Sequence, residues 1–253
     1  VYKGTAIGPI NVLKKSDGIV KRQHVEDVAA ELQRLEDAKK QAQAQLGALY
    51  EKALQEVGEV NAQIFEVHQM MLEDEDYQDA IHSMIETEEL NAEYAVAVTG
   101  DNFAEIFANM DDEYMQARSA DVKDISNRLI RNLSGEEELD WAHMEPSIIV
   151  ADDLTPSETV QMDKRKILAF VTVHGSTNSH TAILARMMNI PALIGVPVEL
   201  DSLHSGTMGI VDGKDAVFCV DPDEATIAAA HEMQARAAEQ KRLLANYKGR
   251  PSV

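Results

Sequence analysis

The pattern of apolar and polar positions changes twice along the chain. Residues 1–20 combine glycines with β-branched residues, which predicts a strand and a turn. From about His24 to Asn132 the apolar residues recur at helical spacing without any proline, so we predict a bundle of long helices. From Pro146 onward, short apolar runs alternate with helical ones, a pattern typical of an α/β layer.

The first helix of the bundle is predicted from apolar residues in alternating steps of three and four. They form a coiled-coil-like face that is interrupted only at Lys39, and they are Val25, Val28, Leu32, Leu35, Ala42, Leu46, Leu49 and Ala53. Further helices are predicted over 61–72, 74–86, 91–109 and 112–132, and residues 134–138 predict a helix C-cap and a solvated linker.

The C-terminal part is predicted to hold the strands that the N-terminal strand needs as partners. Strands are predicted over 147–151, 167–173, 192–196, 208–211 and 216–220, and helices over 156–162, 181–188 and 222–247. The first strand has no partner strand in the helical stretch. We therefore expect it to pair with strands of the C-terminal part, so that the helical bundle is an insertion into the α/β layer. We therefore predict a discontinuous α/β domain of residues 1–20 and 144–221, an inserted all-α subdomain of residues 21–143 and a connector helix of residues 222–253.

The net charge narrows the classes of partner. Lys and Arg total 23 and Asp and Glu total 44, which gives a formal charge of −21. Such a surface repels phosphate backbones and anionic lipids and attracts basic protein surfaces, so we expect no nucleic acid or membrane partner.

The chain has neither a stretch as long as a membrane span nor an N-terminal basic-then-apolar segment, and we expect a cytoplasmic protein. It starts without Met, and we expect it to be a piece of a longer protein.

Cysteine and histidine usage argues against disulfides and metal sites. Cys219 is the single cysteine, and its apolar neighbours predict a buried strand position. The histidines show no metal-ligand spacing, so we predict no metal site. The chain contains neither a phosphate loop ending in Gly-Lys-Ser/Thr nor a Gly-x-Ser-x-Gly elbow. Nucleotide hydrolysis and Ser-triad chemistry therefore lack support.

The most informative segment is the loop that leads to His180. An apolar strand is followed by small and polar residues, among them Ser176, Thr177 and Ser179, and then by a predicted helix. His180 would lie in the first turn of that helix, where free backbone N–H groups favour an anion such as a phosphoryl group. The loop hydroxyls could then bond the phosphoryl oxygens. The spacing alone also fits a structural capping role for this histidine, and both readings stay open here.

Several motifs in the same order resemble Enzyme I of the phosphoenolpyruvate:sugar phosphotransferase system. They are Asp-Leu-Thr-Pro-Ser-Glu-Thr at 153–159, the His180 loop, and Ala-Arg-Met-Met-Asn-Ile-Pro-Ala at 185–192. Met-Leu-Glu-Asp-Glu at 71–75 and Asp-Glu-Tyr at 112–114 add to the resemblance, as do Arg118, Asp121, Asp124 and Arg128. The likeness covers the whole chain and only the N-terminal half of that family.

The resemblance implies a phosphohistidine α/β domain with an inserted helical subdomain that binds the carrier protein HPr. It implies that His180 is charged from phosphoenolpyruvate and discharged to HPr, and that the Thr159 hydroxyl bonds the active imidazole. An apolar and acidic HPr-docking surface would include Glu59, Met70, Met71, Glu75 and Asp76. Phosphoenolpyruvate and Mg²⁺ belong to the C-terminal half of the family, so this chain is expected to need no cofactor and to exchange phosphate with HPr without charging itself. A homodimer of the whole enzyme is a hypothesis that the sequence leaves open.

One departure and two alternatives accompany this interpretation. The family loop is usually Gly-Gly-Arg-Thr-Ser-His, whereas Thr177 here replaces the arginine and removes a fixed positive charge. The chain could instead be the swivelling phosphohistidine domain of a pyruvate-phosphate dikinase or phosphoenolpyruvate synthase, which would not be expected to carry the long helical insertion. A helical adaptor with an inert α/β part would leave the small-residue loop before His180 without a purpose.

Overall fold

The computed structural model describes residues 4–13, 20–136, 143–163, 165–175, 180–187 and 189–248, with the backbone alone at residues 180, 181, 184, 247 and 248. The chain divides into two compact units. One combines Val1–Ser16 with Asp140–Val253, and the other is Asp17–Leu139. The first unit therefore includes residues 222–253, which the sequence analysis treats as a separate connector.

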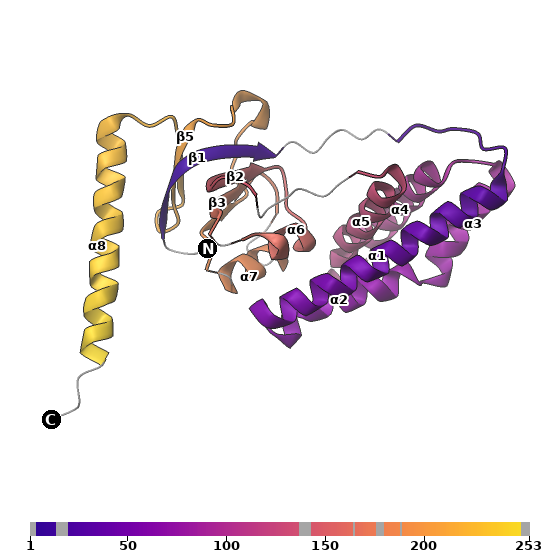
Figure 1. The fold of residues 1–253 in the computed structure, drawn as a ribbon, viewed down its shortest axis with the longest axis horizontal. Helices are drawn as coiled ribbons and strands as arrows, with labels where there is room; N and C mark the ends of the chain where they lie inside the picture. The colour runs from indigo at the N-terminus through magenta and orange to yellow at the C-terminus, as the bar shows by residue number, and fades with distance from the viewer. Residues whose placement is uncertain are drawn as a thin grey trace. The chain divides into compact units, whose positions relative to one another are not determined.

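The first unit is built on a mixed sheet that, among the described residues, has six strands in the order β4-β3-β2-β1-β5-β6. The strands are β1 (Thr5–Leu13), β2 (Ser147–Ala151), β3 (Ile167–Thr172), β4 (Ala192–Ile194), β5 (Met208–Asp212) and β6 (Val217–Val220). Strands β1 to β4 run parallel, while β5 is antiparallel to both β1 and β6. The N-terminal strand thus joins the sheet of the α/β layer, as expected, and it lies between β2 and β5 (Figure 1).

Helices connect the parallel strands of this unit. Strand β2 leads to α6 (Pro156–Gln161) and β3 leads to α7 (His180–Met187). A short 3-10 helix, η1 (Leu200–Ser202), follows β4, and α8 (Glu224–Lys248) follows β6. Apolar side chains of the central strands form the core, among them Ile10, Ile148, Val150, Ala169 and Val171. The predicted α/β layer is confirmed.

Cys219 is not fully buried, so the prediction of a buried strand position is wrong. The structure shows this side chain partly exposed, although its apolar neighbours predicted full burial. Strand β6 is at the edge of the sheet and pairs only with β5 among the described residues, and no residue of β6 is fully buried. An apolar run predicts a strand, but it does not tell whether the strand is central or peripheral.

The second unit is the predicted bundle of helices. They are α1 (Val28–Val57), α2 (Glu59–Leu72), α3 (Glu75–Glu88), α4 (Ala92–Ala108) and α5 (Glu113–Ser134), and they are drawn from indigo to magenta in Figure 1. Side chains fix the starts of α3 and α5, because Asp74 and Asp112 accept the backbone N–H groups of Tyr77 and Tyr114. Gly135, in the left-handed conformation, ends α5.

The contact face of α1 differs from the predicted one at both its start and its middle. Val25 precedes the helix, which begins after the N-cap Asp27, and Val28 and Leu32 are only partly buried. The buried series instead consists of Glu31, Leu35, Ala38, Ala42, Leu46, Leu49, Ala53 and Val57. Ala38 fills the gap that Lys39 leaves, so the buried face continues without interruption.

In the described part of the chain, no helix is both long enough and apolar enough to cross a membrane.

Candidate functional site

The carboxyl ends of β2 and β3 bring two chain segments together in the first unit. The two strands are parallel neighbours, and Ala151 of β2 pairs with Thr172 of β3 at their carboxyl ends. Their pairing continues past the strand ends, where the Val173 N–H donates to the Ala151 carbonyl at 3.2 Å and the His174 N–H donates to the Asp152 carbonyl at 2.8 Å. Ligands of parallel α/β sheets bind at this edge, outside the carboxyl ends of the strands. The candidate site therefore lies where α6 and α7 begin.

Helix α7 starts at His180, which places this residue in the first helical turn. Backbone N–H groups in that turn have no partner within the helix, and the helix dipole favours negative charge there. Helix α7 contacts both α6 and β4, and its Ala182 and Ala185 are fully buried. The predicted loop residues Ser176, Thr177 and Ser179 lie outside the described residues, as does the imidazole of His180, so their roles stay predictions.

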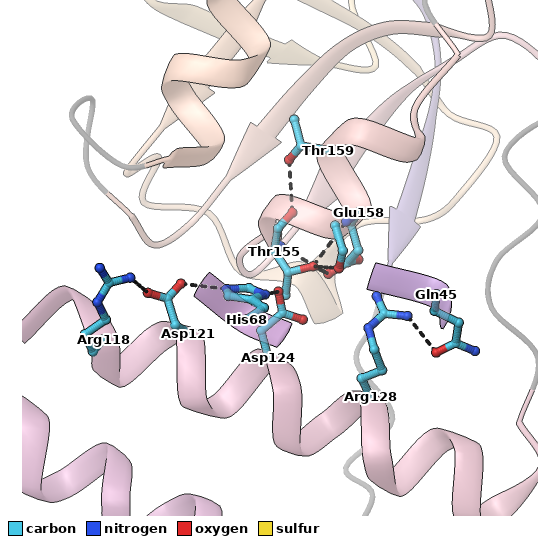
Figure 2. A network of polar contacts seen from close by, with 10 residues as sticks. Gln45, His68, Arg118, Asp121, Asp124, Arg128, Thr155, Glu158 and Thr159 are labelled. Atoms are coloured by element: carbon cyan, nitrogen blue, oxygen red, sulfur yellow. Dashed lines mark hydrogen bonds and ion pairs between the residues drawn. The ribbon is translucent and has the colours of Figure 1, made fainter. Parts of the chain in front are cut away.

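Helix α6 carries Thr159 and begins with a capping box. The Thr155 hydroxyl accepts the Glu158 N–H at 3.2 Å, and the Glu158 carboxylate accepts the Thr155 N–H at 3.2 Å (Figure 2). Thr159 is fully buried, and its hydroxyl donates to the Thr155 carbonyl at 3.1 Å. Because a hydroxyl has one proton, the Thr159 oxygen can only accept any further hydrogen bond. This capping box was not predicted, although the Thr-x-x-Glu spacing of residues 155–158 indicates one.

A second histidine lies at the same edge of the sheet. The His174 Nε2 atom is 3.2 Å from the Asp152 Oδ1 atom, and both side chains are at least half exposed. Gly175 follows with φ of 112°, a conformation that side chains disfavour. This pair was not predicted, because residues 22 positions apart meet only once β2 and β3 pair.

The helical unit contains a buried histidine between two aspartates. The His68 Nε2 atom lies 2.9 Å from Asp121 Oδ1, and its Nδ1 atom lies 3.9 Å from Asp124 Oδ2. Arg118 Nη1 donates to the other oxygen of Asp121 at 3.2 Å (Figure 2). A carboxylate can only accept, so Nε2 of His68 carries a proton. The spacing of His68 from the buried Phe65 and Leu72 of α2 could have revealed its position on the inner face.

The predicted docking residues lie on α2 and α3. Met70 is 72% exposed, and Met71 is partly buried. Glu75 and Asp76 are exposed in the first turn of α3, directly after the α2–α3 connection. Glu59 is exposed at the opposite end of α2, about 16 Å from Met70 along the helix axis. The structure thus groups four of the five predicted residues around one connection.

No group of three or more His, Cys, Asp or Glu side chains within the described ranges is arranged to hold a metal ion.

Comparisons with known proteins find the same family over both units. The family model described as "PEP-utilising enzyme, N-terminal" matches residues 1–118, and "PEP-utilising enzyme, mobile domain" matches residues 143–216. The phosphoenolpyruvate-protein phosphotransferase of Priestia megaterium is 36% identical over 239 residues, which are 94% of this chain and 42% of the relative. The protein of the same name from Bacillus subtilis (strain 168) is 34% identical over 99% of this chain and 44% of its own length. This chain thus spans less than half the length of these relatives.

Solved structures agree with the sequence comparisons. The NMR solution structure of Enzyme I (nEIt) matches with a TM-score of 0.76 and 33% identity, over 93% of this chain and 96% of that one. The N-terminal domain of Enzyme 1 – Nitrogen has the same fold, with a TM-score of 0.64 and 24% identity, over 92% of this chain and 97% of that one. The chain therefore belongs to the Enzyme I family and has the fold of that family's N-terminal domain.

Proposed function

We propose that this chain accepts a phosphoryl group on His180 and passes it to the carrier protein HPr within the sugar phosphotransferase system. The observation that carries the proposal is the place of His180 in a chain of the Enzyme I family. His180 is the first residue of α7, at the carboxyl edge of the parallel strands β2 and β3, where backbone N–H groups favour an anion. The relatives from Priestia megaterium and Bacillus subtilis are named for phosphoryl transfer between phosphoenolpyruvate and a protein.

The transfer needs one neutral ring nitrogen of His180 as the nucleophile. Its electron pair forms the N–P bond, while the bond from phosphorus to the donor atom breaks and its electron pair stays with the donor. The other ring nitrogen then carries the proton. Thr159 is suited to receive that N–H, because its own proton is bonded to Thr155 and its oxygen can still accept. Hydroxyls of Ser176, Thr177 and Ser179 would complete the cradle for the phosphoryl oxygens.

HPr would dock on the helical unit around the α2–α3 connection. Met70 offers an exposed apolar anchor, and the neighbouring Glu75 and Asp76 are suited to a partner with a basic rim. The remaining steps rest on the resemblance alone. Phosphoenolpyruvate would charge His180 with Mg²⁺ held by the C-terminal half of the enzyme, in the cytoplasm, and a homodimer of the whole enzyme stays a hypothesis.

The function is tested with radiolabelled phosphorylated HPr as the donor. We expect the 253-residue chain to take up label in a form that is labile to acid and stable to alkali, and to return it to unlabelled HPr. His180→Ala should abolish uptake while leaving HPr binding and the unfolding midpoint unchanged. Phosphoenolpyruvate with Mg²⁺ alone should label nothing. Undiminished partner function in His180→Ala would favour the adaptor alternative, and labelling by phosphoenolpyruvate alone would contradict the proposed division of the reaction.

The docking surface is tested with a matched pair of methionines. Met70→Ala should weaken HPr binding by about 1 kcal/mol or more, because an exposed apolar anchor loses its contact area. Met233→Ala, which removes an exposed methionine from α8 in the other unit, should leave the affinity unchanged. Titration calorimetry measures both, and equal affinities for Met70→Ala and the unsubstituted chain would contradict this assignment.

A further inference from the structure

Two loops at the carboxyl edge of the sheet are joined by a side-chain pair that the proposed function does not use. His174 belongs to the segment that leads from β3 toward His180, and Asp152 belongs to the segment that leads from β2 to α6. Their side chains approach to 3.2 Å, and the His174 N–H donates to the Asp152 carbonyl at 2.8 Å. Each residue thus contacts the other through both backbone and side chain.

The backbone at Gly175, which directly follows His174, is also constrained. Gly175 has φ of 112°, and a Cβ atom at this position would lie 3.2 Å from Ile194 Cγ2 and 3.6 Å from Asp153 Oδ1. The backbone direction directly after His174 is therefore set by close neighbours from the β2–α6 segment and from β4. At the far end of the connection, α7 contacts both α6 and β4. Both ends of the segment that carries His180 are thus anchored to the same neighbouring elements.

We propose that Asp152 and His174 are positioning residues for phosphoryl transfer at His180, because their pairing fixes the start of the β3–α7 connection on the β2–α6 connection. This inference rests on the proposed function and adds to it. Nucleophilic attack requires the reacting atoms to be held about 3 Å apart and aligned, so a shift at the base of the connection lowers the rate of transfer. HPr docks on the other unit in the proposed function, so its binding does not depend on the pair.

The chain offers a matched control for this pair. His24 and Glu89 of the helical unit approach to 2.8 Å, and their side chains are 64% and 53% exposed, against 69% and 50% for His174 and Asp152. The two pairs have the same chemistry and similar solvent exposure. Of these two pairs, only Asp152–His174 is next to the segment that carries His180. Loss of this pair should therefore lower the rate of phosphoryl transfer, and loss of the control pair should leave the rate unchanged.

Rapid-quench measurement of label transfer from phosphorylated HPr tests the proposal in the 253-residue chain. Asp152→Ala and His174→Ala should each lower the rate constant at saturating HPr about two- to fivefold, which is the free energy of an exposed polar pair expressed as a ratio of rates. The half-saturating HPr concentration should not change, and the double variant should be no slower than either single one. His174→Lys keeps a nitrogen donor beside Asp152 and should recover the rate, while Glu89→Ala should transfer like the unsubstituted chain. Unchanged rate constants, additive losses, a change in half-saturation alone or an equal loss in Glu89→Ala would each overturn the proposal.

Amide hydrogen exchange without HPr separates this inference from the proposed function. Asp152→Ala should speed exchange of the His174 amide at least twofold, and Glu89→Ala should not. A chain that accepts no phosphate from HPr would overturn the proposed function. Unaltered exchange of the His174 amide in Asp152→Ala would overturn the positioning role, whether or not the chain accepts phosphate from HPr.

Discussion

His68 and His24 form the same kind of contact in opposite surroundings. His68 is 1% exposed and faces Asp121, which is 3% exposed, whereas His24 and Glu89 are largely in solvent. Water replaces a lost partner at the surface, but it cannot do so in the core. The stability of the helical unit should therefore depend on the first pair and hardly on the second.

Replacing these two histidines tests that difference. His68→Ala should lower the free energy of unfolding by about 3 kcal/mol, because it removes a hydrogen-bond donor from the buried Asp121 carboxylate. His24→Ala should change it by less than about 1 kcal/mol. Urea unfolding followed by circular dichroism measures both, and equal losses in the two variants would contradict the importance of burial.

Arg34 joins three helices through its guanidinium group. It donates to Glu31 on its own helix, to Glu93 on α4 and, at 3.1 Å, to the Leu133 carbonyl on α5. Burial raises the pKa of Glu93, but the hydrogen bond and charge of Arg34, together with hydrogen bonds from the backbone and from Asn91, outweigh burial, so this pKa lies below its usual value. A carboxyl group with a lowered pKa in the folded state stabilises the fold above its unfolded pKa, and this contribution disappears as the pH falls through the folded pKa.

The pH dependence of stability checks the role of Glu93. Glu93→Gln should be less stable than the unsubstituted chain at pH 7, and the difference should shrink as the pH falls below about 4, where the carboxyl group of the unfolded chain becomes protonated. Glu88→Gln, which changes an exposed residue at the end of α3, is the control and should show little difference at any pH. A Glu93→Gln difference that stays constant from pH 7 to pH 3 would contradict the assignment.

At the scale of elements, α4 and α5 approach closely at a glycine. A Cβ atom on Gly100 would lie 2.5 Å from the Ser126 Oγ atom, which also bonds the Tyr77 hydroxyl at 2.7 Å. The buried tyrosine and the serine leave no room for a side chain at position 100. Gly47 on α1 is different, because the nearest atom to its Cβ position is the end of the flexible Gln69 side chain, 3.5 Å away.

The two mid-helix glycines therefore predict opposite effects of the same substitution. Gly100→Ala should destabilise the unit by about 1–3 kcal/mol through overpacking, although alanine has the higher helix propensity. Gly47→Ala should stabilise it by up to about 1 kcal/mol, because only the propensity changes. Thermal unfolding of the two variants measures the effects, and a stabilised Gly100→Ala would show that α4 and α5 are not closely packed at this point.

The sequence predicts most elements because their ends carry local signals. Asp74, Asp112 and Gly135 set helix ends by bonds to residues within a turn, and these are readable from spacing alone. The errors concern positions that depend on the rest of the fold. Val25 has the right spacing for α1, but Asp27 caps the helix after it, and Cys219 is in an edge strand that an apolar run cannot distinguish from a central one.

At the scale of the whole molecule, the candidate site is only partly predictable from the sequence. His180 and Thr159 could be proposed from a motif, and the structure places them on adjacent helices of one unit. The Asp152–His174 pair could not be predicted, because it depends on two strands becoming parallel neighbours. The inserted bundle separates β1 from β2 in sequence, yet the two strands are paired in the sheet.

In the proposed function, His180 alone among the histidines carries the phosphoryl group. The chain contains eight histidines, so the phosphorylated residue can be identified by peptide mapping with mass spectrometry at neutral to alkaline pH after exchange with phosphorylated HPr. The proposed function predicts that the phosphate is found on His180 and on no other histidine. Phosphate on His174, His68 or any other residue, with His180 unmodified, would contradict it.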